Sequence, residues 1–395
     1  MSMARGIFIV GAKRTPFGTF GGKLKDHTAT DLAAAATAAA LKSAGIAAEQ
    51  VDTAVCGNVC STSVHGPYIA RHMALQAGVK IETPCLTVNR LCGSGFQSIV
   101  NGAQELQLSE SEIAVCAGAE NMSMAPYALR GARFGTKLGV DLKLEDSLWA
   151  TLTDHGIKTP MGMTAENLAE KYNISREECD KYALASQERW KLANGEGRFE
   201  QEMAPIILKS RKGEEEFKVD EHPKTTTLER MSKLPPVFKK DGTVNAGNAS
   251  GICDGAGSIV LASEDAVKAH NLKPLARLVN YHVSGCDPHI MGIGPVPAIR
   301  QLLSKTGYQL SDVDMVEINE AFAPQTLACM KELGLEHEKT NVNGGAIAMG
   351  HPVGASGSRI TAHLCYELQR TQKRLAIGSA CIGGGQGIAL LLERC

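Results

Sequence analysis

The 395-residue sequence has almost no net charge and no long hydrophobic run. Its formal charge is −1, and no basic cluster alternates with aromatic residues, so we expect neither a nucleic acid nor an acidic membrane surface as a partner. The longest apolar stretch spans residues 32–41, whereas a membrane helix needs about 20 apolar residues. We therefore expect no integral membrane segment, and a buried alanine-rich helix there instead.

The sequence also lacks the usual signatures of disulfide, zinc and dinucleotide sites. It contains twelve cysteines but no Cys-x-x-Cys pair, and Cys56 and Cys60 have no second pair nearby that would complete a zinc site. The first ten residues run directly into an apolar strand without a secretory pattern, which favours a reducing compartment. No Gly-x-Gly-x-x-Gly follows a strand. We expect mostly buried free thiols, no metal and no redox cofactor.

Glycine is abundant, with 41 residues, and strands alternate with helices along the chain. This alternation predicts an α/β fold with parallel or mixed sheets. The expected strands are 7–10, 51–57, 112–120, 275–281, 313–319 and 375–381, and the expected helices are 31–43, 96–108, 297–305 and 354–369. Thr30 or Asp31 is a plausible N-cap for the first helix.

The second set of elements repeats the order of the first about 260 residues later, and the segments that begin at Val51 and Val313 start alike. This repetition indicates an internal duplication, with two α/β halves whose sheets face each other. We assign residues 1–120 and 249–272 to the N-terminal half and 273–395 to the C-terminal half. Residues 121–248 are charge-rich, contain both tryptophans and six of the thirteen methionines, and are expected to form an insertion with helices around 164–193.

Four segments carry residues suited to catalysis. Cys92 in "NRLCGSG" stands at the start of a helix, where free backbone N–H groups and the helix dipole favour thiolate. His351 stands in the glycine-rich segment 341–359 and could act as a base. Cys381 in "SACIGGGQG" ends a strand ahead of glycine N–H groups that could face an oxyanion. Asn319 in "EINEAFAPQ" could hold a water or orient an imidazole.

Each segment taken alone has an ordinary structural explanation: a buried cysteine in a turn, a histidine bound to loop carbonyls, a glycine hairpin, or an asparagine helix cap. The duplication makes them converge. Cys92 and His351 precede equivalent helices of the two halves, and equivalent turns meet where the halves touch. We therefore expect two cysteines, a histidine and an asparagine to share one pocket.

These four segments, together with "GNASGICDGAG" at 247–257, closely resemble the active-site blocks of the thiolase family, in the family's order and over essentially the full chain. Within the family the resemblance is strongest to the animal mitochondrial 3-ketoacyl-CoA branch. It implies a layered α-β-α-β-α fold and an inserted loop domain that covers coenzyme A and substrate. It also implies CoA-dependent cleavage of 3-ketoacyl-CoA in fatty acid β-oxidation.

The resemblance supplies a role for each residue. Cys92 would be the acylated nucleophile, His351 would accept its proton, and Cys381 would shuttle a proton to or from the reacting carbon. Asn319 would hold a water that completes one oxyanion hole with His351, and the N–H groups of Cys92 and Gly383 would form the other. The expected substrate and CoA contacts are Met161, Phe238, Ala246, Ser250 and Phe322.

Several features remain open. Thr159 and Pro160 replace an aromatic and a histidine that some acetoacetyl-CoA thiolases carry, which favours a roomier straight-chain site near Met161 and Met163. The alternative functions are an acetoacetyl-CoA thiolase working in the biosynthetic direction, a condensing ketoacyl synthase, an acyl-CoA hydrolase and a non-enzymatic acyl-CoA carrier. The resemblance implies CoA and acyl-CoA as substrates rather than cofactors, a homotetramer built as a dimer of dimers, and a mitochondrial location, with the cytoplasm as the alternative.

Overall fold

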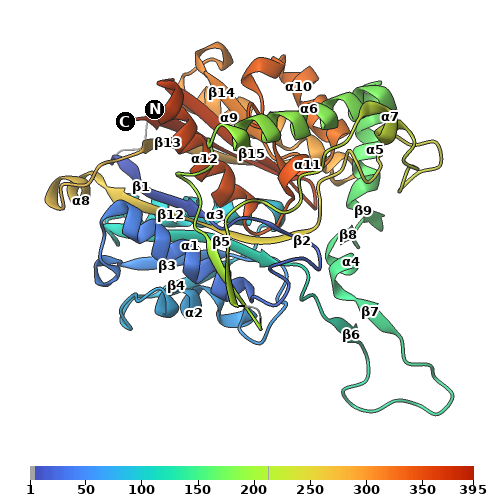
Figure 1. The fold of residues 1–395 in the computed structure, drawn as a ribbon, viewed down its shortest axis with the longest axis horizontal. Coiled ribbons are helices and arrows are strands. Elements are labelled where there is room, and N and C mark those ends of the chain that lie inside the picture. Colours follow the sequence, from blue (N-terminus) through green and yellow to red (C-terminus); the bar gives the residue numbers. More distant parts are fainter. Residues whose placement is uncertain (1–4, 212) are drawn as a thin grey trace.

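The computed structural model describes residues 5–211 and 213–395, and its largest element is a ten-stranded mixed sheet (Figure 1). Residues 1–4, where the N-terminal segment begins, lie outside the described residues. Nine strands follow the order β4-β3-β5-β12-β1-β13-β16-β15-β14, and β2 (Gly18–Thr19) pairs with β12 at the side. The nine strands are β1 (Ile7–Arg14), β3 (Thr53–Gly57), β4 (Cys85–Val88), β5 (Ile113–Asn121), β12 (Cys253–Ser263), β13 (Ala276–Gly285), β14 (Met315–Ile318), β15 (Leu375–Ile382) and β16 (Gln386–Arg394).

The pairing pattern contains the duplication expected from the sequence. In the N-terminal half, β3 and β5 are parallel, and β5, β12 and β1 then pair antiparallel in turn. In the C-terminal half, β14 and β15 are parallel, and β15, β16 and β13 then pair antiparallel in turn. The two half-sheets join through a short antiparallel contact, in which Phe8 and Ile9 pair with Arg277 and Ala276. The two half-sheets are therefore joined edge to edge, through β1 and β13, into one continuous sheet.

The helices form layers on and between the two half-sheets (Figure 1). Helices α3 and α12 contact each other, and α12 contacts β12 of the first half as well as β15 of the second, so this pair fills the middle layer. Helix α1 packs on β1 and β12, and α9 packs on β13 and β16. The main helices are α1 (Ala29–Ala44), α2 (Ile69–Gln76), α3 (Ser94–Gln107), α8 (Glu264–Ala269), α9 (Pro295–Thr306), α10 (Ala323–Leu333), α11 (Ala346–Met349) and α12 (Ser356–Thr371).

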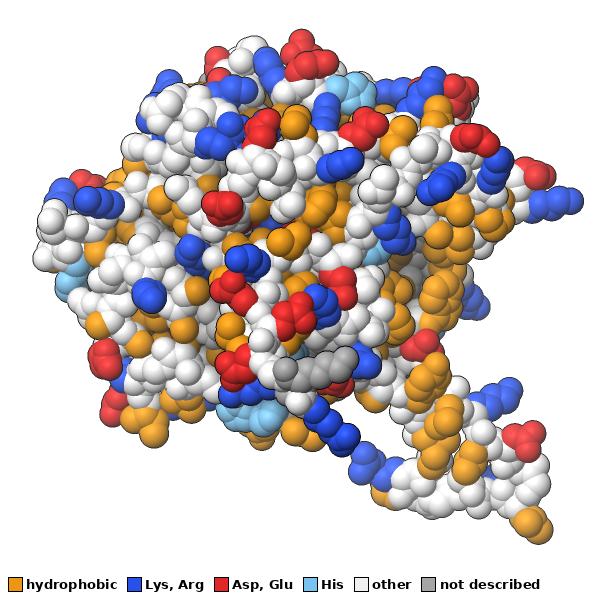
Figure 2. All heavy atoms as spheres, in the orientation of Figure 1, with side chains coloured by type: hydrophobic (Ala, Val, Ile, Leu, Met, Phe, Trp, Pro, Cys, Tyr) orange, Lys and Arg blue, Asp and Glu red, His pale blue; other side chains and the backbone are white. Residues whose placement is uncertain are grey.

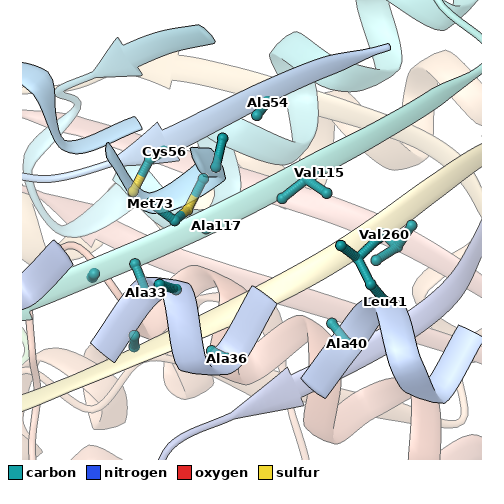
Figure 3. Close-up of a cluster of buried hydrophobic side chains, with 14 of the residues drawn as sticks. Ala33, Ala36, Ala40, Leu41, Ala54, Cys56, Met73, Val115, Ala117 and Val260 are labelled. Carbon is teal, nitrogen blue, oxygen red and sulfur yellow. The ribbon is translucent and has the colours of Figure 1, made fainter. Parts of the chain in front are cut away.

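Helix α1 illustrates how composition decides packing distance. Its alanines, including Ala33, Ala36 and Ala40, lie against Val115 and Val260 of the sheet in one buried cluster (Figure 3). Such short side chains let the helix approach the strands closely. The helix begins earlier than expected, because Thr28 is the N-cap and forms a capping box with Asp31, rather than Thr30 or Asp31 serving as the cap.

Helices α3 and α12 approach each other even more closely. A Cβ atom on Gly95 would lie 2.6 Å from the backbone nitrogen of Ser358, and one on Gly357 would lie 2.2 Å from the backbone nitrogen of Phe96. Both distances are far below contact distance, so only glycine allows this crossing. The crossing brings the first turns of the two helices together, and with them the residues that precede each helix.

Residues between β5 and β12 form small hairpins and helices. The elements are β6 (Tyr127–Leu129), β7 (Leu144–Asp146), α4 (Ser147–Thr151), β8 (Thr153–Asp154), β9 (Thr159–Pro160), α5 (Met161–Lys171), α6 (Arg176–Gly195), β10 (Ile206–Ser210), β11 (Gly213–Phe217) and α7 (Leu228–Ser232). The helical stretch expected at 164–193 is two helices, because Ser175 caps a new one. We propose that 121–248 is one unit inserted into the N-terminal half, between its segments 1–120 and 249–272.

The chain between β6 and β7 projects from the body as a long arm (Figure 1). Among residues 5–211 and 213–395, no helix combines the length and the apolar character needed to cross a bilayer.

Candidate active site

Cys92 and His351 line the same cavity of about 180 Å³. Cys92 lies in a short 3₁₀ turn, Leu91–Gly93, directly ahead of α3, and His351 lies in the loop ahead of α12. The two residues come from equivalent positions of the two halves, as expected from the duplication. The other lining residues are Met122, Trp149, Leu152, Met161, Gly162, Phe238, Ala249, Ser250, Gly251, Ile252, Met291, Ala321, Phe322 and Val353.

A second cavity of about 260 Å³ also reaches Cys92. It shares Leu152, Met161 and Val353 with the first cavity, and it extends past Gly383 and Gly384 toward residues 151–155 of the insertion. Cys92 therefore lies where two cavities meet, with Met161 on the wall of both. A thioester carbonyl placed at Cys92 has room on two sides.

The turn that carries Cys92 is held in an uncommon backbone conformation. Leu91 has a φ of 45°, in the left-handed region that non-glycine residues seldom occupy. The side chain of Asn89 accepts a hydrogen bond from the N–H of Leu91 at 2.9 Å, and the hydroxyl of Ser94 accepts one from the N–H of Arg90 at the same distance. These contacts fix the turn, and with it the position of the thiol.

Burial raises the pKa of the Cys92 thiol to about 11, although hydrogen bonds from the backbone N–H groups of Gly383 and Cys92 itself act in the opposite direction. The N–H donors that favour thiolate at the start of α3 are present, but desolvation outweighs them, so the thiol is protonated at neutral pH. A protonated thiol requires a base before it can act as a nucleophile.

His351 supplies a neutral imidazole. Burial, reinforced by the positive charge of Arg359, lowers the pKa of His351 to about 3, so the ring carries no charge at physiological pH. Its Nδ1 lies 2.6 Å from the hydroxyl oxygen of Ser356, and its Nε2 lies 3.3 Å from Nδ2 of Asn319. Its backbone N–H donates to the carbonyl of Gly251 at 2.9 Å, which fixes the loop.

Asn319 and Cys381 do not line the first cavity themselves but contact residues that do. Asn319 follows β14, its side chain is fully buried, and its Oδ1 has no partner among the described residues. It lies ahead of the N-cap of α10, Phe322, so it is not the cap of that helix. Cys381 is fully buried near the end of β15 and packs with Met291 and Ala321, which line the first cavity. Burial and the nearby Cys92 raise the pKa of Cys381 well above its usual range.

Four of the five expected substrate and CoA contacts line the first cavity: Met161, Phe238, Ser250 and Phe322. Gly383, which was expected to donate to an oxyanion, lines the second cavity. Ala246 is exposed and lines neither of these two cavities, and neither does Met163.

Residues that the sequence motifs did not single out also build the site. Glu120, at the end of β5, is fully buried and accepts hydrogen bonds from the N–H groups of Val59, Cys60 and Gly354 and from the side chain of Asn58. Burial raises the pKa of this carboxyl group to about 8. Glu120 thus ties the His351 loop of one half to the other half. A sequence shows neither this burial nor these donors.

No cluster of histidine, cysteine, aspartate or glutamate suited to a metal ion occurs among the described residues.

Comparison with known proteins agrees with this arrangement. Residues 7–265 match the thiolase N-terminal domain and residues 272–394 match the thiolase C-terminal domain. The chain belongs to the thiolase family. The mitochondrial 3-ketoacyl-CoA thiolase of Homo sapiens is 62% identical over 394 residues, which cover 100% of this chain and 99% of that protein.

Solved thiolase structures show the same fold. A crystal structure of human mitochondrial 3-ketoacyl-CoA thiolase superposes with a TM-score of 0.99 at 62% identity and covers 100% of both chains. A structure of the human thiolase in complex with CoA gives a TM-score of 0.98 at 62% identity and covers 100% of this chain and 99% of that one. The thiolase resemblance and the fold expected from the sequence are confirmed.

The raised pKa of Cys92 predicts how its reactivity depends on pH. Only thiolate reacts with iodoacetamide, and its fraction rises about tenfold per pH unit below the pKa. The alkylation rate of Cys92, followed by peptide mass spectrometry, should therefore be low at pH 7 and climb steadily to pH 9. Cys92→Ser measures the background from the other cysteines. A plateau below pH 8 would show that the resting protein holds a thiolate.

Proposed function

We propose that this protein is a 3-ketoacyl-CoA thiolase, an acyltransferase that cleaves 3-ketoacyl-CoA with free CoA to acetyl-CoA and a shortened acyl-CoA. One observation carries the proposal: a cysteine and a neutral histidine face one largely apolar cavity, with a second buried thiol directly behind its wall. The 62% identity to the human enzyme over the full chain supports the same activity. The reaction belongs to fatty acid β-oxidation.

In the first half-reaction, Cys92 attacks the 3-keto carbon while Nε2 of His351 takes the thiol proton. The bond between C2 and C3 then breaks, the acyl group remains on Cys92 as a thioester, and acetyl-CoA leaves as its enolate. Cys381 donates its proton to C2 of this enolate. A thiol whose pKa is held high by burial is protonated before this step, as the step requires.

In the second half-reaction, the Cys381 thiolate takes the proton from the thiol of free CoA. The CoA sulfur attacks the acyl carbon, the bond to Cys92 breaks, and the Cys92 sulfur recovers its proton from His351. Protons and thioesters balance over the cycle. The two thiols and the imidazole carry every proton in these steps, and CoA enters as a substrate rather than as a resident cofactor.

Two sets of donors are proposed to stabilise the oxyanions. The N–H groups of Cys92 and Gly383 point toward the Cys92 sulfur, where an oxygen on the acyl carbon would develop charge. Protonated Nε2 of His351 and a water held by the unpaired Oδ1 of Asn319 would serve the other oxygen. The first cavity, which Met161, Phe238, Ser250 and Phe322 line, is proposed to hold CoA and the reacting acyl group. Ala246 is exposed and lies four residues before Ser250 in the sequence, and it is proposed to lie at the entrance of the first cavity.

Reversal of the same steps would join two acetyl units into acetoacetyl-CoA, and this biosynthetic direction is the alternative function. Water in place of CoA would hydrolyse the acyl thioester, so slow acyl-CoA hydrolysis is proposed as a side activity. Relatives 61–62% identical, from Homo sapiens and Mus musculus, are named as mitochondrial enzymes, and we assign the protein to the mitochondrion rather than the cytoplasm.

CoA dependence tests the function directly. Purified protein with acetoacetyl-CoA should lose the ketoacyl absorbance only when free CoA is present, and CoA-independent release of thiol would indicate a hydrolase instead. Cys92→Ser should abolish turnover because an alcohol is a far weaker nucleophile at neutral pH. Intact-protein mass spectrometry after incubation with acetyl-CoA should show an acetyl increment on the wild type and none on the variant. A wild type that never acylates would refute the proposal.

Removal of the second thiol should separate the half-reactions. Cys381→Ala should still take acetyl from acetyl-CoA onto Cys92, since that transfer needs no proton at carbon. Thiolysis should fall by about 10²–10⁴-fold, the usual contribution of one positioned acid or base. Cys365→Ala, at another buried cysteine on α12, is the matched control. Near-wild-type thiolysis by Cys381→Ala would assign the proton transfer to another group.

We propose a homotetramer on the basis of two unpaired surfaces. The arm between β6 and β7 carries exposed apolar side chains, seen in Figure 2 on the part that projects from the body; they include Phe134, Leu138, Val140, Leu142 and Leu144. Strand β4 lies at an end of the main sheet and exposes Leu86. Single proteins seldom leave such surfaces uncovered, and two different contacts between copies make a dimer of dimers.

Sedimentation should give the mass of four 41.9 kDa chains. Replacing Phe134 and Leu138 by serine should yield two-chain particles, because the arm loses its apolar contact while the β4 edge remains paired. Leu108→Ser, which alters an exposed leucine at the end of α3, should leave four chains. An unchanged mass for the arm variant would remove the arm from the interface.

A further inference from the structure

We propose that Ser356 is a positioning residue for catalysis, which holds a proton on Nδ1 of His351 and leaves Nε2 free to accept the proton of Cys92. The proposal rests on the function proposed above and adds a residue that no catalytic motif assigned. It concerns which nitrogen of the imidazole is protonated before the reaction begins.

The contact between the two side chains is short and buried. The hydroxyl oxygen of Ser356 lies 2.6 Å from Nδ1 of His351, and both residues are buried. Nδ1 therefore faces Ser356 rather than the cavity. Among residues 5–211 and 213–395, the other side-chain hydrogen bond of the ring joins its Nε2 to Asn319. Of the two nitrogens, Nε2 is the one available to the reacting thiol.

The surroundings of Ser356 allow its hydroxyl to accept from the ring. The oxygen lies 3.2 Å from the carbonyl of Pro352, which can only accept a hydrogen bond. If the hydroxyl donates its single hydrogen to Pro352, its lone pairs face Nδ1, and the ring must place a proton there. Nε2 is then unprotonated and can accept from Nδ2 of Asn319 in the resting state.

This arrangement suits a base that must release its proton again. A serine hydroxyl orients the ring and adds no negative charge that would oppose burial and the Arg359 charge, which together lower the pKa of His351 to about 3. After taking the Cys92 proton, the ring keeps its Nδ1 bond to Ser356 and presents Nε2–H to an oxyanion. It then returns the proton to Cys92. A carboxylate in this position would hold the imidazolium instead.

The position of Ser356 allows its hydroxyl to fix the orientation of the His351 ring. It is the first residue of α12, and the backbone N–H groups of Ala355 and Ser356 both donate to the carbonyl of Pro352, at 2.8 and 3.1 Å. The loop from His351 to the helix is therefore a closed turn. Because α12 contacts strands of both half-sheets, the hydroxyl is held by a helix of the middle layer.

The decisive measurement is the protonation state of His351 in the free wild-type protein. Histidine labelled with ¹⁵N, with the His351 signals identified by their loss in His351→Gln, should show a protonated Nδ1 and an unprotonated Nε2. A protonated Nε2 in the resting protein would overturn the proposal. This measurement does not depend on turnover, so it remains informative even if the proposed function fails.

Kinetics give the second test. Ser356→Ala should slow acetylation of Cys92 by acetyl-CoA about tenfold, the factor expected for one lost hydrogen bond, and lower kcat with little change in KM for CoA. Its His351 signals should shift toward protonation at Nε2. Ser358→Ala is the matched control, since Ser358 is buried on the same helix and contacts the carbonyl of Gly95 instead. Wild-type acetylation by Ser356→Ala would overturn the proposal, whereas a wild type that is never acetylated would refute the proposed function.

Discussion

The close crossing of α3 and α12 is the constraint on which the rest of the molecule depends. Each helix belongs to a different half of the duplicated fold, and each is preceded by one residue of the candidate site, Cys92 or His351. The helices can cross at this distance only because Gly95 and Gly357 leave no side chain between the backbones. A larger residue at either position would separate the helix starts, and the thiol and imidazole would no longer share a cavity.

Burial sets the chemistry of the site more strongly than the helix dipole does. Desolvation raises the pKa of the Cys92 thiol and lowers that of His351, so both groups rest uncharged. A neutral pair suits an enclosed apolar cavity, because a permanent thiolate and imidazolium there would need compensation from the surroundings. In the proposed reaction, charge develops only on the oxygen of an acyl carbonyl, next to the N–H groups of Cys92 and Gly383.

Much of this could be predicted from the sequence, because local patterns and the repeated order of elements determine it. The duplication, the helices ahead of which Cys92 and His351 lie, and the membership of the thiolase family all follow from residue patterns. The roles of Glu120 and Ser356 could not be found that way. Glu120 acts through burial and through a partner far away in the chain, since it reaches Gly354 across 234 positions. The partners of Ser356 are near it in sequence, but only the folded loop shows which of their atoms meet. The start of α1 was misplaced because Thr28, Thr30 and Asp31 can all cap a helix.

The bonds of Glu120 have a consequence for the newly made chain. The hydrogen bonds of its carboxyl group are complete only when the N–H of Gly354 joins those of Val59 and Cys60, and Asn319, His351 and Cys381 also come from the second half. While the ribosome is still synthesising the last fifth of the polypeptide, the first half can hold Cys92 in its turn but has no base, no second thiol and no closed cavity around it. The nascent protein therefore carries an ordinary cysteine, and it gains its chemistry only when translation is nearly finished.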